Sequence, residues 1–215
     1  DFGDGPAQVH PFTEDISAVI NFIDRQQADG GDDLPEDVAG GLAAAVGLQW
    51  ASQARTVVLI ADAPCHGQHH HAFGDTDSYP AGDPTGLSMR TLMQAFRGSH
   101  IDFTFVQLLS DTDKMQRNLQ LAYESAAGPE NISKFELRDL RDIIEEAGGY
   151  TALGTERAGE VSAMLSAAVT PSIHASYQSY TSGVQTYSAP VRTSYAGYRG
   201  SSARKAAGTT MSAAR

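Results

Sequence analysis

The spacing of hydrophobic residues along the first fifty positions predicts two amphipathic helices. In "PFTEDISAVINFIDRQQADGG", residues 11–31, isoleucine and valine recur every three or four positions, Thr13 is a candidate N-cap, and a glycine pair ends the pattern. The segment "LPEDVAGGLAAAVGLQW", residues 34–50, has the same period, and Pro35 suits the first helical position. We therefore expect two helices before the first clear strand.

From residue 55 onward, short apolar runs alternate with helical patterns. "RTVVLIA", residues 55–61, is continuously apolar and β-branched, which predicts a strand buried on both faces of a parallel sheet. The later segments predict helix at 86–98, strand at 101–109, helix at 111–126, a weaker strand at 135–140 and a closing helix at 155–169. This alternation indicates an α/β domain, with a doubly wound, mostly parallel sheet covered by helices on both faces.

The last part of the chain has a different character. Residues 171–215 are rich in Ser, Tyr, Ala and Gly and show no apolar period. So little aliphatic surface cannot offset the entropy lost on ordering, so we expect a basic, disordered tail. The sequence thus predicts a folded domain at 1–170 followed by a tail at 171–215.

Charge and composition narrow the classes of partner. Residues 1–170 hold 10 basic and 26 acidic side chains, which argues against nucleic acid as a partner of the folded part. No apolar run reaches the roughly 20 residues that a membrane-spanning helix needs. Cys65 is the only cysteine, which excludes an intrachain disulfide and fits a reducing compartment, so we expect a cytoplasmic protein.

A cysteine and four histidines follow the strand at 55–61, in "ADAPCHGQHHHAF". Structural zinc sites usually draw their ligands from two separated pairs, whereas these side chains share one loop. The pattern therefore disfavours Zn²⁺, and we expect most of the histidine run to be exposed. A zinc-dependent hydrolase built on this loop is the minor alternative, and it would require stoichiometric zinc in the purified protein.

Three carboxylates suggest a site for a hard cation. Asp62 directly follows the strand at 55–61, and Asp33 and Glu36 lie on a loop that opens onto a helix. In open α/β sheets, ligands bind at the carboxyl ends of the strands, and oxygen ligands from separate loops suit Mg²⁺. The alternative is that Asp33 caps the helix, while Glu36 and Asp37 interact favourably with its dipole.

The stretches "GGDDLPEDVAGGLAAAVGLQW" and "RTVVLIADAPCHG" together resemble the von Willebrand factor A domains found beside α-type protein kinases and in related intracellular proteins. The resemblance implies a site at which Mg²⁺ or Mn²⁺ accepts a carboxylate from a partner protein. It places Asp33 and Glu36 on the second metal-site loop and Asp62 on the third. Residues of the shared signature expected to shape these loops are Gly30, Gly31, Pro35, Asp37, Pro64, Cys65, His66 and Gly67.

One departure from that family concerns the first metal-site loop. Its D-x-S-x-S motif is absent, and the first strand, the first helix and most of the second strand have no counterpart in the chain. We therefore expect a free sheet edge, which another chain could complete. The functional prediction is a non-enzymatic, protein-binding domain without a kinase domain. The alternative is a scaffold component with a vestigial metal site, whose contacts come from the surface of the fold and the tail.

Overall fold

Three parallel strands form the centre of the molecule. The computed structural model describes residue 2 and residues 7–27, 33–52, 54–72, 77–126, 133–149 and 154–181. The strands are β1 (Thr56–Ala61), β2 (Asp102–Gln107) and β3 (Phe135–Asp139), in the order β1-β2-β3. Both pairings are parallel, and β1 pairs with β2 along its whole length. The predicted α/β class with a parallel sheet is confirmed.

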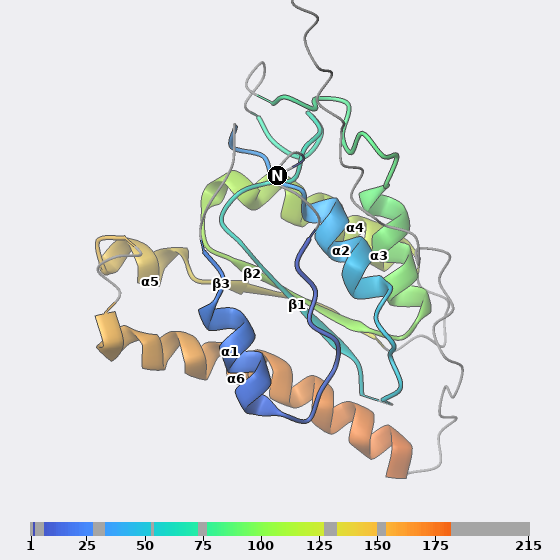
Figure 1. Ribbon diagram of the computed structural model, residues 1–215, viewed down its shortest axis with the longest axis vertical. Helices are drawn as coiled ribbons and strands as arrows, with labels where there is room; N and C mark the ends of the chain where they lie inside the picture. Colours follow the sequence, from blue (N-terminus) through green and yellow to red (C-terminus); the bar gives the residue numbers. More distant parts are fainter. Residues whose placement is uncertain are drawn as a thin grey trace, which may run out of the picture.

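Helices lie on both sides of this sheet (Figure 1). One side carries α2 (Val38–Val46), α3 (Met89–Gly98) and α4 (Asp113–Ser125), and the other carries α1 (Ile16–Asp24) and α6 (Gly154–Thr181). A 3-10 turn, η2 (Ser110–Thr112), leads into α4, and a short helix that the sequence did not predict, α5 (Arg141–Glu146), follows β3. Contacts with all three strands hold α6 against the sheet.

The main core lies between the sheet and the α2–α4 layer. Phe103 and Phe105 of β2 are fully buried, and they share a cluster with Phe96 of α3 and Tyr123 of α4. The Phe103 ring stacks on that of Phe135, with centroids 5.5 Å apart. A smaller apolar cluster on the opposite face joins the sheet to α5 and α6; it contains Val106, Leu140 and Ile144, with Val161 and Met164 packed against it.

Strand β1 lies at an edge of the described sheet, and one of its faces is open. The prediction that this strand is buried on both faces is wrong, because Val58 is 37% exposed and Ile60 is 53% exposed. Helix α1, on the same side of the sheet as α6, does not cover them: it contains no buried residue, and its Ile16 is 74% exposed. The structure therefore leaves apolar surface uncovered on this side.

Two predicted helix starts differ from the observed ones. Asp15, not Thr13, caps α1, because its carboxylate accepts a hydrogen bond from Ala18 N, whereas Thr13 Oγ1 accepts from Asp15 N. Helix α2 begins at Val38, so its first position is not Pro35. In both cases an aspartate further along the chain takes the role of the cap, since a carboxylate satisfies an N–H group of the first turn.

Helix α6 extends beyond the boundary predicted between domain and tail. It continues through Pro171 to Thr181, so the start of the segment predicted to be disordered is helical. Proline lacks a backbone N–H donor, but its restricted φ is compatible with a helix, and α6 continues through the residues that follow it. Residues 182–215 lie outside the described residues. No helix in the described ranges has the length and apolarity needed to cross a membrane.

Candidate functional site

The histidine loop after β1 is largely buried, which corrects the expectation that it is exposed. His66 and His70 are 4% exposed and His71 is 2% exposed, whereas His69 is exposed. Helix α4 holds this loop, because the Lys114 Nζ atom donates to Gln68 O and to His71 O at 2.8 and 2.9 Å. The sequence could not show this burial, because the contacts join the loop to residues more than forty positions away.

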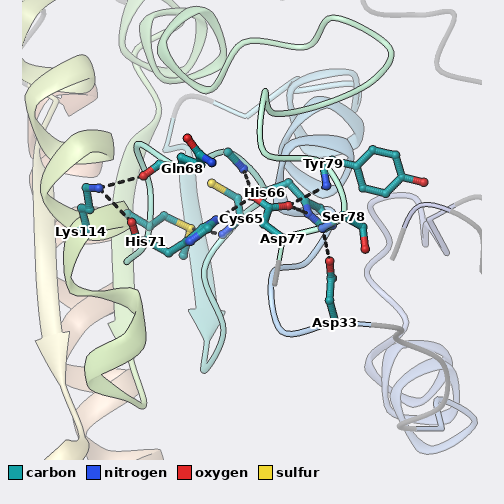
Figure 2. A network of polar contacts seen from close by, with 11 residues as sticks. Asp33, Cys65, His66, Gln68, His71, Asp77, Ser78, Tyr79 and Lys114 are labelled. Carbon is teal, nitrogen blue, oxygen red and sulfur yellow. Dashed lines mark hydrogen bonds and ion pairs between the residues drawn. The ribbon is translucent and has the colours of Figure 1, made fainter. Parts of the chain in front are cut away.

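Asp77 is the centre of the hydrogen-bond network in this loop (Figure 2). It is 5% exposed, and each carboxylate oxygen accepts two hydrogen bonds. Oδ1 accepts from His66 Nδ1 at 2.7 Å and from Tyr79 N at 2.8 Å. Oδ2 accepts from Gly67 N and from His71 Nε2, both at 2.8 Å. One buried carboxylate therefore ties together the start, middle and end of the loop.

These four donors determine the charge state of Asp77. Burial by itself raises the pKa of a carboxyl group, but the hydrogen bonds from the two imidazoles and the two backbone N–H groups favour the ionised form. Their combined effect outweighs burial, and the pKa of Asp77 lies well below its ordinary value. The loop is thus built around a carboxylate that stays ionised at neutral pH.

Two of the predicted metal ligands lie together at the end of β1. Glu36 N donates to Pro64 O at 2.8 Å, and Glu36 forms an isolated parallel bridge with Cys65, so the loop before α2 is attached to the loop after β1. Asp62 is exposed, and both Asp62 and Glu36 line a groove of about 350 Å³ between α2 and β1. The structure therefore places these two residues on one surface, at the carboxyl end of the strand.

The third predicted ligand, Asp33, belongs to a different group. Its Oδ2 atom accepts a hydrogen bond from Ser78 N, and its Oδ1 atom is buried without a hydrogen-bond partner. Ligand atoms of Asp33, His66 and Asp77 lie within 4.8 Å of one another. This is the one such cluster of three metal-ligating side chains in the described part of the chain. The assignment of Asp33, Glu36 and Asp62 as joint ligands therefore stays a prediction.

The loop-shaping residues of the signature have observable roles where the structure describes them. Asp37 caps α2 through a 2.7 Å hydrogen bond from Gly40 N. Gly67 has a φ of +108°, a left-handed conformation that favours glycine, and a Cβ there would lie 3.1 Å from the His69 ring. Gly30 and Gly31 lie outside the described residues.

Neither Asp77 nor Lys114 was predicted from the sequence, and His71 was expected to be exposed. A usable signal was present, because "DTDSYP" places an aspartate a few positions beyond the histidine run. Asp77 has the buried position and the partners described above, which are visible only once the loop has folded, and Asp75 lies outside the described residues.

Cys65 is expected to be chemically inert in the folded protein. It is 2% exposed, and burial, reinforced by the nearby Asp77, raises the pKa of its thiol far above the ordinary value. Because the thiolate is the reactive form, a disulfide reagent should leave the native protein unlabelled and label one thiol per chain in urea. Rapid stoichiometric labelling without denaturant would instead show that this loop opens readily.

Comparison with curated proteins found a relative of part of this chain. The chain is 36% identical over 106 residues to "Alpha-protein kinase vwkA" of Dictyostelium discoideum. The match covers 48% of this chain and 17% of the relative, so the kinase activity in that name is a statement about the relative alone. No family model matches the chain, and no solved structure matches it.

Proposed function

We propose that this chain is a protein-interaction domain that binds a carboxylate of a partner protein through Mg²⁺ or Mn²⁺. Glu36 and Asp62 supply oxygen atoms to the ion, water fills further positions, and an Asp or Glu of the partner completes the coordination. The observation that supports this proposal most strongly is that Glu36 and Asp62 line the same groove at the carboxyl end of β1.

Two carboxylates in this otherwise apolar groove suit a hard cation. Asp62 is exposed, so its carboxylate can exchange water for an ion at little cost in desolvation, and the half-buried Glu36 lies in the same groove. Mg²⁺ retains several waters and commonly uses only one or two protein carboxylates, which leaves positions for a partner's ligand. The ion would supply positive charge between two negative surfaces, and the protein's residues would orient it and determine where the partner docks.

The test is thermal unfolding of the 215-residue chain with EDTA and with magnesium. A site with an affinity of about 1 mM should gain about 1.4 kcal/mol at about 10 mM Mg²⁺, which corresponds to a rise of roughly 3 to 5 °C at this size. Asp62→Asn should abolish the rise. Asp24→Asn, which removes an exposed carboxylate of α1, should keep it.

A second measurement addresses the partner's carboxylate directly. Mn²⁺ bound to the protein should enhance the relaxation of water protons, and an acidic peptide should reduce that enhancement by displacing water from the ion. A matched peptide with Gln and Asn in place of Glu and Asp should have no effect. If Asp62→Asn behaves like the wild type in both assays, the proposed role of this groove is wrong.

A scaffold role in a larger assembly is the second candidate, and a separate observation favours it. Val58 and Ile60 face the side of the sheet on which α1 lies, because the alternate residues Val57 and Leu59 pack against the main core. Val58, Ile60 and the isoleucines of α1 are exposed large apolar residues. A strand or helix from another segment could cover this surface and pair with the free edge of β1. A folded protein that shows no response to magnesium would support this role over ion-mediated binding.

A further inference from the structure

We propose that Asp33, His66 and Asp77 form a separate binding site for a transition-metal dication, for which Zn²⁺ is the probe. This site goes beyond the magnesium groove, because its ligands include an imidazole and two of its three members are almost fully buried. It also differs from the zinc site considered from the sequence, which relied on Cys65 and the histidine run.

The ligand atoms of Asp33, His66 and Asp77 lie close enough together to share one ion. Two loops that are distant in sequence converge here, since Asp33 precedes α2, whereas His66 and Asp77 both belong to the loop after β1. Their ligand atoms lie within 4.8 Å of one another, a separation that a single ion can span with bonds of about 2.0–2.2 Å and modest adjustment of Asp33. An ion here would cross-link the two loops.

The two carboxylates of this group also favour a cation between them. Asp33 Oδ1 is buried and accepts no hydrogen bond, which is costly for a carboxylate oxygen that is not compensated by a positive charge. Asp77, which is 5% exposed, adds a second carboxylate within the same cluster. A dication neutralises both carboxylates and gives the Asp33 oxygen a partner.

The donor atoms of the group determine which metal ion it can bind. One nitrogen and two carboxylate ligands suit zinc and its first-row neighbours, whereas magnesium and calcium prefer oxygen alone. Hydrogen bonds from residues outside the group also orient two of its ligands, because Gly67 N and His71 Nε2 donate to Asp77 and Ser78 N donates to Asp33. Such supporting hydrogen bonds orient metal ligands and strengthen metal binding.

The test is calorimetric titration of the EDTA-treated, dialysed 215-residue chain with zinc chloride. The wild type should bind one zinc ion saturably. Asp33→Asn should weaken the affinity by about 10-fold or more. This variant should still fold, because the asparagine carbonyl oxygen can accept from Ser78 N as Asp33 Oδ2 does. Circular dichroism before each titration checks the fold.

The matched control is His69→Gln, which removes an exposed, ligand-capable histidine of the same loop that lies outside the group. It should bind zinc like the wild type, and so should Asp62→Asn, which separates this site from the magnesium groove. Equal binding by Asp33→Asn, or loss of binding in His69→Gln, would assign the zinc to the exposed loop and overturn the proposal. Absence of saturable binding by the wild type would also overturn it.

Discussion

Replacing Asp77 with asparagine should lower the free energy of unfolding by about 3–5 kcal/mol, the range expected when one partner of a buried charged network is removed. Four N–H groups point at the two oxygens of Asp77. Asparagine keeps one acceptor but turns an NH₂ group toward two of these donors, so hydrogen bonds are lost and donors face each other. The change should be measured by urea unfolding.

The control for this prediction is Asp62→Asn, which removes an exposed carboxylate from the same loop. Its effect on the free energy of unfolding should stay within about 0.5 kcal/mol, because exposed substitutions without buried partners rarely exceed that. If Asp77→Asn costs less than about 1 kcal/mol, the network around Asp77 does not persist in solution.

The second large effect is a loss of stability in mild acid caused by His70. Burial lowers the pKa of His70 to about 3, and the positive charges of His69, His71 and Lys114 contribute in the same direction. In the unfolded chain the group keeps a pKa near 6.5. Below that pH the unfolded state binds a proton that the folded state does not, so the free energy of unfolding falls as the pH falls.

The expected slope is about 1.4 kcal/mol per pH unit from His70 alone, continuing toward the folded-state pKa near 3. Urea unfolding between pH 6.5 and 4.5, a window of about two units, should therefore show a loss of roughly 2–3 kcal/mol. This window lies above the range in which Asp77 contributes, because a group with a lowered folded-state pKa loses its stabilising effect only as the pH falls below its unfolded value, 3.8.

Two variants identify the histidine responsible. His70→Gln should reduce the slope by about the amount assigned to His70, and the matched control is His174→Gln, at an exposed position of α6. Some slope should remain in His70→Gln, because the pKa of His69 is also lowered, first by burial and then by Lys114 and His71. An unchanged slope in His70→Gln would show that His70 is accessible to protons in the folded protein.

The strands were predictable from the sequence because their apolar runs are short, β-branched and bounded by polar loops. "RTVVLIA" and "IDFTFVQLL" became β1 and β2, and even the weaker "FELRDL" became β3. Exact helix starts were less predictable. Thr13 and Asp15 are both good caps, and the choice between them depends on where the chain enters the helix.

The candidate site was only partly predictable. The resemblance directed attention to the loops carrying Asp33, Glu36 and Asp62, and the structure joins two of those loops through Glu36 and Pro64. The resemblance did not indicate Asp77, whose four hydrogen bonds are visible only once the loop has closed on itself.

By itself, the sequence determined the α/β class, the parallel strands and the acidic character of the domain, because these follow from local periodicity and composition. Only the tertiary structure decided which polar residues are buried and which meet. His66, His71 and Asp77 come together because α4 holds the loop from outside while a buried carboxylate holds it from within. Such contacts join residues distant in the chain, and local pattern carries no information about them.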